Sequence, residues 1–239
     1  TTIAPSAVPY DDGWPAPAEA TASDIARIRD DFVAAARRAE AAGFDLIELH
    51  GGHGYLLHQF LSPLTNRRSD AWGGTPARRM RFVIEVYEAV RAVWPADRPI
   101  GIRLSATDWV EGGWTPEETV ALARTLKDLG IDYVDVSSGG LHPAQKIPLA
   151  PGYQAPFAAK VRAGAGVTTM TVGLIADPRH AERLVADGQT DFIKLGRGHL
   201  YDPHWAWHAA EALGVEIAYP PKLGAAQPKL RPMLFPARG

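Results

Sequence analysis

The feature that most constrains the fold of this chain is a strict alternation of short apolar segments with helical patterns. Five segments, each rich in apolar side chains and followed by glycine or small polar residues, predict buried strands. The expected strands are residues 44–49, 100–104, 132–136, 168–172 and 192–195. Apolar residues at helical spacing predict helices at residues 21–43, 75–94, 115–130, 156–163, 178–187 and 203–213. Because strands and helices alternate, we expect an α/β fold with a parallel sheet.

Two parallel architectures compete, a doubly wound sheet and a (β/α)8 barrel. A doubly wound nucleotide-binding sheet carries a glycine fingerprint after its first strand and an acidic residue about 20 residues later. This pattern is missing here. A (β/α)8 barrel often binds phosphate with the loops after its last two strands. Gly173 and the segment Gly196-Arg197-Gly198 follow the last two predicted strands, so the barrel is favoured.

The predicted units occupy only part of a barrel. Five strand-helix units span about residues 44–213, and the flanking segments are too short for three more. We therefore expect an incomplete (β/α)8 TIM barrel that forms a single domain over residues 1–239. Within it, residues 219–239 are an irregular, proline-broken tail, and the lead-in at residues 1–20 is extended along the surface.

Composition excludes several classes of function. A formal net charge of -2 in 239 residues gives no strongly basic surface for nucleic acid. No apolar run reaches the roughly 18 residues that a membrane span needs. Without cysteine the chain has neither disulfides nor thiolate chemistry, which fits a reducing compartment. We expect a cytoplasmic protein with no nucleic-acid and no membrane partner.

The first predicted strand leads into a polar cluster. Residues 47–55 read IELHGGHGY, so His50, His53 and Tyr55 follow the carboxyl end of a strand. Parallel α/β folds bind their ligands at that end. Three interpretations are open: a packed turn with internally satisfied histidines, a His-x-x-His metal site, or a donor pair that grips a carbonyl oxygen, with the tyrosine as proton source.

Polar residues also mark the next strands. Arg103 lies inside a short buried strand, which is costly unless an anion or a hydrogen-bond acceptor meets it. That partner could be a ligand, or Asp108 or another carboxylate of the chain. Ser137 and Ser138 open a run of small polar residues that suits a phosphate or a polar ring edge, although they could equally cap a turn. Tyr153 could line a cavity or pack against its own loop.

Further motifs follow in order. They are Gln59-Phe60-Leu61-Ser62-Pro63, Asn66-Arg67-Arg68, Asp70-x-Trp72-Gly73-Gly74, Arg103, Asp135-Val136-Ser137-Ser138-Gly139, Gly173 and Leu195-Gly196-Arg197. Together with residues 47–56, this order resembles the old yellow enzymes, above all their bacterial, thermophilic-like branch, over roughly residues 3–214.

The resemblance implies an FMN-dependent ene-reductase on a (β/α)8 barrel, with this chain supplying strands four to eight. NADPH or NADH would reduce FMN, and hydride would pass from flavin N5 to the β-carbon of an α,β-unsaturated carbonyl compound. His50 and His53 would donate to the substrate's carbonyl oxygen, and Tyr55 would protonate the α-carbon. A metal site at the two histidines is then disfavoured, since no third ligand accompanies them.

The resemblance also implies a set of cofactor-binding residues. Arg103 would face the N1 and C2 carbonyl edge of the flavin, where a cation favours the anionic reduced ring. Ser137, Gly173, Gly196 and Arg197 would hold the phosphate and ribityl chain. The charged residues of the long connection after residue 61 are instead expected to anchor that connection, namely Arg67, Arg68, Asp70 and Arg78.

The sequence departs from the family pattern in several places. Trp72 stands where tyrosine is usual, Ala77 where asparagine is usual, and the tail does not match the usual ending. In that ending an arginine reaches a neighbouring subunit's site, a role open here to Arg231 or Arg238. We expect the assembled enzyme to be a homo-oligomer.

The residues that the family carries on its first three strands cannot be located in this sequence. We expect a companion polypeptide of roughly 110 to 130 residues to supply the three missing strand-helix units. Two alternative functions are kept open. One is a non-catalytic or partner-dependent half of a split flavoprotein, and the other is a related FMN barrel reductase with another substrate. Related FMN barrel reductases with other substrates usually add an iron-sulfur cluster bound by cysteines, and this sequence has no cysteine.

Overall fold

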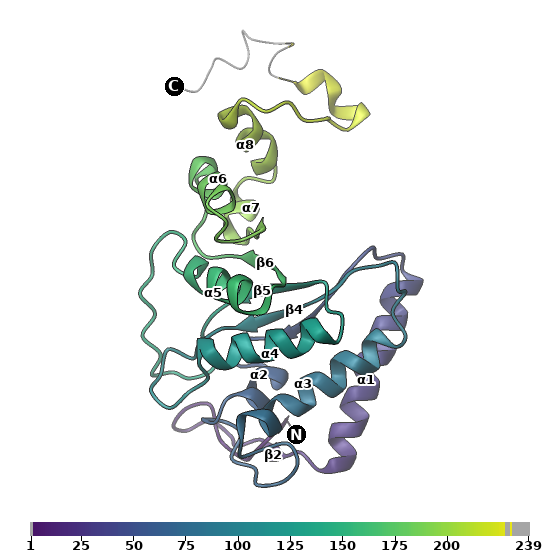
Figure 1. Ribbon diagram of the computed structural model, residues 1–239, viewed down its shortest axis with the longest axis vertical. Coiled ribbons are helices and arrows are strands. Elements are labelled where there is room, and N and C mark those ends of the chain that lie inside the picture. Colours follow the sequence, from purple (N-terminus) through teal and green to yellow (C-terminus); the bar gives the residue numbers. More distant parts are fainter. Residues whose placement is uncertain (1, 228–229, 231–239) are drawn as a thin grey trace.

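The computed structural model describes residues 2–227 and 230, and its main feature is a twisted parallel sheet (Figure 1). The strands of this sheet are β3 (Ile47–Gly51), β4 (Ile100–Ser105), β5 (Tyr133–Ser137), β6 (Thr168–Thr171) and β7 (Phe192–Ile193). They pair in the order β3-β4-β5-β6-β7, and every pairing is parallel. The five predicted strands and their parallel arrangement are therefore confirmed.

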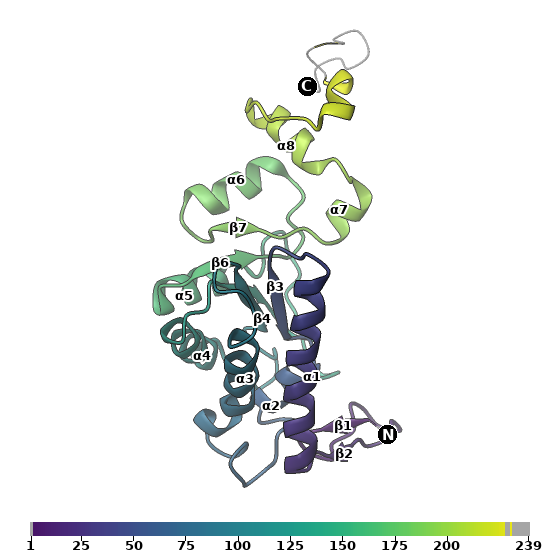
Figure 2. The ribbon, with the colours of Figure 1, turned by 90° about the vertical axis from the view of Figure 1, so that its right-hand side faces the viewer.

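Helices precede, connect and follow the strands of the sheet. They are α1 (Ala22–Ala41), α2 (Leu56–Leu61), α3 (Pro76–Arg91), α4 (Pro116–Asp128), α5 (Ala155–Ala165), α6 (Pro178–Ala186), α7 (Arg197–Tyr201) and α8 (Trp205–Leu213), followed by the 3-10 helix η1 (Pro221–Ala226). Helices α1, α3, α4 and α5 pack against one another in that order (Figures 1 and 2). The crossovers through α3, α4 and α5 thus place their helices along the same side of the sheet, as in a barrel wall.

Local sequence signals fix the ends of several helices. Thr115 accepts a hydrogen bond from the backbone of Glu118, whose carboxylate accepts one from the Thr115 N–H, so α4 begins with a capping box. Thr21 and Asp24 form the same arrangement at α1. Each box satisfies backbone donors that have no partner within the helix, and losing such a cap typically costs about 0.5–2 kcal/mol.

The hydrophobic core lies between the sheet and these helices. Helix α3 contributes Phe82, Val86 and Val90, all fully buried, and β4 presents Ile100 and Ile102 to the same cluster. The Phe60 and Phe82 rings meet with centroids 4.5 Å apart, which joins α2 to α3. Burying a side chain of this size contributes about 1.5–3 kcal/mol, so the core holds the strands in a fixed register.

The long connection after α2 is anchored by its own polar residues. The Asn66 amide donates to the carbonyl oxygens of Phe60 at 2.6 Å and Trp72 at 2.7 Å. Arg68 pairs with Asp70 and donates to the carbonyl oxygens of Pro5 and Ala20, so it ties the connection to the lead-in. The anchoring role expected for Arg68 and Asp70 is confirmed.

The predicted start of the first strand is wrong. The expected strand covered residues 44–49, but β3 begins at Ile47, and Phe44 and Leu46 are 59% and 48% exposed. The reason is that the Phe44 N–H donates to the Ala39 carbonyl and closes the turn that follows α1. Residues leaving a helix in this way are not available to a strand.

Four short elements or pairs were not predicted. They are α2, α7, the 3-10 helix η1 within the tail that was expected to be irregular, and a parallel pair in the lead-in, β1 (Ile3–Ala4) with β2 (Ala18–Glu19). α8 and η1 lie at the opposite end of the molecule from β1 and β2 (Figures 1 and 2). Arg231 and Arg238 of the predicted tail lie outside the described residues.

Among the described residues, no helix has the length and apolarity to cross a bilayer.

Gly101 provides a test of the packing. A Cβ at this position would lie 2.2 Å from Cζ of Tyr133, whose hydroxyl donates to the Ile47 carbonyl oxygen at 3.3 Å. We expect Gly101→Ala to lower the free energy of unfolding by about 1–3 kcal/mol, because the ring has to leave its place on the sheet.

Urea denaturation followed by circular dichroism measures this loss. Gly198→Ala is the control, because a Cβ there would meet only ordinary contacts of 3.9 Å with Ala176 and 4.0 Å with Leu195. Equal stability of the two variants would contradict the packing described for β4 and β5.

Candidate functional site

A cavity of about 400 Å³ opens where the carboxyl ends of β4, β5, β6 and β7 meet. Its lining includes His53, Arg103, Ser137, Gly173, Gly196 and Arg197. All five residues predicted to bind the cofactor therefore lie around one space, although they come from four different strand-helix units. This clustering follows from the parallel register, which brings Arg103 opposite Asp135 and Ser105 opposite Ser137.

The two histidines lie side by side at the end of β3. Their ring centroids are 5.1 Å apart, and His50 Nε2 lies 3.4 Å from His53 Nδ1. His53 Nε2 lies 2.7 Å from the Ser137 hydroxyl, which donates to Gln154 Oε1 at 3.2 Å. If each ring is neutral, the hydrogen bonds run consistently from His50 through His53 and Ser137 to Gln154.

Burial and nearby cations favour the neutral form of both rings. Burial lowers the pKa of His53 from 6.5 to about 4, with Arg103 as the next largest cause. Burial also lowers the pKa of His50, again assisted by Arg103. A neutral imidazole offers one N–H and one acceptor nitrogen, so the pair can donate hydrogen bonds without bringing positive charge into the site.

Tyr55 and His50 lie outside the lining of this cavity. Tyr55 is 64% exposed, and its ring centroid is 5.3 Å from that of His50. The three predicted catalytic residues are thus contiguous, with His50 between His53 and Tyr55, but only His53 reaches the cavity itself. Among the described residues, no group of three or more His, Cys, Asp or Glu side chains is arranged to hold a metal ion.

Arg103 has a carboxylate partner within the chain. Its Nε lies 3.1 Å from Asp135 Oδ2, and a terminal nitrogen lies 3.5 Å from the Ser137 hydroxyl. The alternative pairing with Asp108 is wrong, because Asp108 is buried against His58 Nε2 at 2.9 Å and accepts from Ser62 at 2.6 Å. Arg103 nevertheless lines the cavity, so the ion pair orients the guanidinium toward it.

Two further residues complete the wall of the cavity: Tyr153, whose role the sequence left open, and Gln154, which was not predicted. Gln154 is buried. Its side-chain oxygen accepts a hydrogen bond from the Ser138 hydroxyl at 2.6 Å, and its side-chain nitrogen donates to the Val172 carbonyl oxygen at 2.8 Å. These two hydrogen bonds join the end of β5 to the end of β6. Tyr153 lines the cavity beside Gly173. A Cβ on Gly173, whose φ is +126°, would lie 2.8 Å from Tyr153 Cε1. Only glycine therefore fits this turn.

Lys194 was also missed by sequence reasoning. It follows β7 directly and lines the same cavity, with its Nζ 2.6 Å from Asp135 Oδ2 and 2.8 Å from Glu48 Oε1. The only sequence signal was a charged residue inside an apolar run, at 192–195. The same kind of signal drew attention to Arg103.

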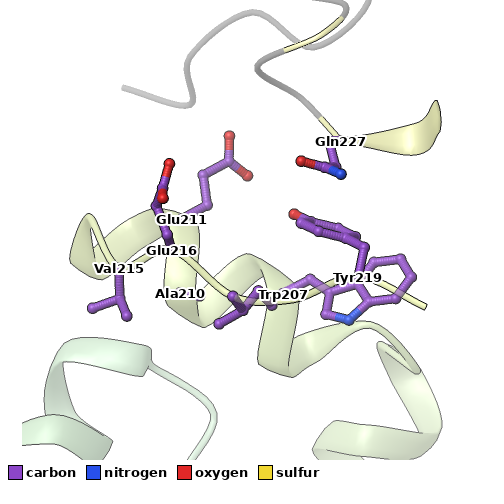
Figure 3. A pocket seen from close by; sticks show the side chains of 8 residues that line it. Trp207, Ala210, Glu211, Val215, Glu216, Tyr219 and Gln227 are labelled. Carbon is purple, nitrogen blue, oxygen red and sulfur yellow. The ribbon is translucent and has the colours of Figure 1, made fainter. Parts of the chain in front are cut away.

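A separate cavity of about 230 Å³ lies at the C-terminal end of the described chain (Figure 3). It is lined by side chains of α8 and the segments after it, including Trp207, Glu211 and Tyr219. The Trp207 and Tyr219 rings are 4.8 Å apart. None of the predicted site residues lines this cavity.

The chemical fit of the main cavity can be judged from its donors. Arg103 and Arg197 supply guanidinium groups, and a Cβ built on Gly196 meets nothing within 4 Å, so the backbone there is open to a bulky group. Cations and exposed backbone amides recognise phosphate. A parallel sheet with a cavity of this kind at its carboxyl edge is typical of barrel enzymes that bind a phosphorylated cofactor.

Comparison with known proteins gives the same class. Residues 6–216 match the family described as NADH:flavin oxidoreductase / NADH oxidase, and the chain belongs to this family. The resemblance to old yellow enzymes drawn from the motifs is thereby confirmed.

The relatives are longer than this chain. It is similar to the NADPH dehydrogenase of Geobacillus thermodenitrificans, with 47% identity over 91% of this chain and 63% of the relative. The NADPH dehydrogenase of Listeria innocua is 44% identical over 91% of this chain and 64% of the relative. The chain therefore spans somewhat less than two thirds of the length of the curated relatives it matches.

Solved structures agree on the fold. A complex of 2-naphthoyl-CoA reductase has a TM-score of 0.82 and 29% identity, covering 88% of this chain and 33% of that one. Morphinone reductase in complex with tetrahydroNAD has a TM-score of 0.73 and 26% identity, covering 92% and 62%. The expected fold class is confirmed: the five units are part of a (β/α)8 flavoenzyme barrel.

The lowered pKa of His53 predicts a pH dependence of stability. Between pH 6.5 and about 4 the unfolded chain binds a proton at this residue while the folded chain does not. The free energy of unfolding should therefore fall as the pH falls through this window, by about 1–2 kcal/mol after allowance for solvent screening of the partly exposed ring. His53→Asn keeps a hydrogen-bonding group but removes the titration.

Urea denaturation at several pH values compares the two proteins. The variant should lose less stability than the wild type on going from pH 6.5 to pH 4. Parallel pH profiles for the two proteins would show that His53 is not held neutral by the fold.

Proposed function

We propose that this chain forms the FMN-binding and substrate-binding part of an NAD(P)H-dependent ene-reductase. The observation that carries the proposal is the single cavity that gathers Arg103, Ser137, Gly173, Gly196 and Arg197 beside His53. When bound, FMN supplies hydride transfer from a reduced nicotinamide to the β-carbon of an α,β-unsaturated carbonyl compound. Membership of the flavin oxidoreductase family supports this assignment.

We assign the recognition of the cofactor to the residues around the cavity. Arg103 would meet the N1 and C2 carbonyl edge of the flavin ring, where a cation stabilises the negative charge of the reduced form. Arg197 and the backbone at Gly196 would hold the phosphate, and Ser137 and Gly173 would accommodate the ribityl chain. Each of these roles uses a group that already lines the cavity.

We assign substrate activation to the histidine pair and Tyr55. Two neutral imidazoles can donate to one carbonyl oxygen and stabilise the negative charge that develops there during hydride addition. His53 Nε2 lies 2.7 Å from the Ser137 hydroxyl, so a substrate oxygen has to replace one of the hydrogen bonds of the pair. The hydroxyl of Tyr55, a residue that is largely exposed, would then protonate the α-carbon.

The proposal requires completion of the barrel. Within residues 2–227 and 230, β3 and β7 are the two edges of the sheet and each pairs on one side only. Unpaired edges of this kind invite association. Three further strand-helix units, from a polypeptide of roughly 110 to 130 residues, would close an eight-stranded barrel. The greater length of the relatives supports this.

A partner-dependent half that is not catalytic by itself is the second candidate, favoured by the same open edges. The two candidates differ in a simple assay. The purified protein is mixed with NADPH and cyclohexenone, and NADPH oxidation is followed with and without the enone. Enone-dependent oxidation by the protein as purified supports the enzyme, whereas oxidation only after addition of a second polypeptide supports the dependent half.

The histidine pair allows a sharp test of mechanism. The double substitution His50→Ala/His53→Ala should lower kcat/KM for enone reduction by about 10²- to 10³-fold, since removing one preorganised donor costs about 2.7–4 kcal/mol. Binding of phenolic ligands should weaken as well, while FMN stays bound, because Arg103 and Arg197 are untouched.

Steady-state kinetics and titration with a phenol measure both effects. His142→Ala is the matched control, because His142 lies in the loop after β5 and does not line the main cavity. Unchanged kinetics in the double variant would remove the assignment of the histidines.

A further inference from the structure

Four charged side chains gather on the cavity-facing side of the sheet. They are Glu48 on β3, Arg103 on β4, Asp135 on β5 and Lys194 directly after β7. Glu48 precedes His50 by two residues and therefore faces the same side of its strand. Arg103 and Asp135 are register partners on adjacent strands. Of the four, Arg103 and Lys194 line the cavity, and Glu48 and Asp135 are their ion-pair partners.

Lys194 is the link that joins this cluster across the sheet. Its Nζ lies 2.8 Å from Glu48 Oε1 and 2.6 Å from Asp135 Oδ2. These partners are 146 and 59 residues away in the sequence. One lysine therefore connects the last strand of the sheet to the first and third.

Lys194 and Arg103 share one carboxylate oxygen. Arg103 Nε lies 3.1 Å from the same Asp135 Oδ2 that Lys194 contacts. Asp135 is fully buried, while the Arg103 side chain is 23% exposed and lines the cavity. A buried carboxylate needs compensating charge, so any change at Lys194 alters how strongly Asp135 holds Arg103.

The charges of the cluster balance only when Lys194 is present. Two carboxylates face two cations, and without the lysine Glu48 and Asp135 would both act on Arg103 alone. Burial opposes the charge on Lys194, but hydrogen bonds and charge from Asp135 and Glu48 outweigh it and raise its pKa. Burial also raises the pKa of Glu48 despite the Lys194 hydrogen bond. The raised pKa of Lys194 agrees with its two carboxylate contacts, whereas at Glu48 the cost of burial outweighs the lysine.

We infer that Lys194 is a positioning residue of the cofactor site: by neutralising Glu48 and Asp135 it leaves the positive charge of Arg103 available to the flavin. The inference rests on the proposed function, and it extends that function to a residue that need not touch the reacting atoms. Loss of Lys194 should leave the guanidinium paired to an excess of negative charge, which disfavours the anionic reduced flavin.

The test uses the flavin-loaded protein and three variants. Lys194→Met removes one positive charge, Glu48→Gln removes one negative charge, and the double variant restores the balance. Lys194→Met should weaken FMN binding by roughly 5- to 20-fold and shift the flavin reduction potential to a more negative value. The double variant should recover most of both losses, a result that a purely structural role would not give.

Lys160→Met is the matched control, because Lys160 is 46% exposed and pairs with Glu117, away from the cavity. FMN affinity is measured by fluorescence titration of the apoprotein, and the potential by a dye-coupled reductive titration. Affinity and potential in Lys194→Met equal to those of wild type and control would overturn the inference while leaving the proposed function intact. Equal impairment of Lys194→Met and the double variant would also overturn it.

Two further outcomes are distinguishable. If Lys194→Met does not fold, the double variant decides: a folded protein with a wild-type potential supports the charge balance, and a protein that again fails to fold rejects it. If the folded wild-type protein takes up no FMN, the proposed function fails, and the role of Lys194 toward the flavin falls with it.

Discussion

The parallel register of β3 to β7 is the constraint on which the rest of the structure depends. Because every strand runs in the same direction, the residues that follow each strand are delivered to one edge of the sheet. Ser137, Gly173 and Gly196 are distant in sequence and yet line one cavity for this reason. The helices on the other side protect the sheet and bury its apolar side chains. The sheet thus fixes the positions of these residues, and the residues that follow the strands provide the polar groups of the cavity.

Buried charge is the main cost of this arrangement, and the structure compensates it locally. Asp135 is fully buried between Arg103 and Lys194, and Asp108 is fully buried between His58 and Ser62. The two carboxylates have different structural roles. Asp108 accepts the backbone N–H of Trp114 and fixes a loop, whereas Asp135 orients a cation at the cavity. A buried carboxylate left without its partners would be strongly destabilising.

Much of the fold could be predicted because its signals are local. Thr115 and Glu118 form a capping box that can be read directly from the sequence, and it defines the start of α4. Five apolar segments predicted five strands because each is short and flanked by glycine or small polar residues. The prediction failed at Phe44 because a helix-terminating turn and a strand start have similar compositions. The prediction missed α2 and α7 because these helices are only 6 and 5 residues long, respectively.

The candidate site was harder to predict, since its details depend on contacts between distant segments. A carboxylate partner for Arg103 was foreseen as one alternative, but only the register identifies it as Asp135. Lys194 gave a weak signal because a lysine near the end of a short strand usually faces solvent. Its contact with Glu48 spans 146 residues, and no local pattern carries that information. The hydrogen bond between His53 and Ser137 was unforeseen for the same reason.

A visible absorption spectrum of the purified protein, recorded as isolated and again after addition of FMN and gel filtration, tests directly whether the cavity binds FMN. A denaturing gel of the same sample shows which polypeptides are present. Oxidised-flavin bands should remain with the protein, and they should be lost when Arg103 and Arg197 are both replaced by alanine. A folded protein that carries no flavin under either condition, even with a polypeptide that completes the barrel, would contradict the account.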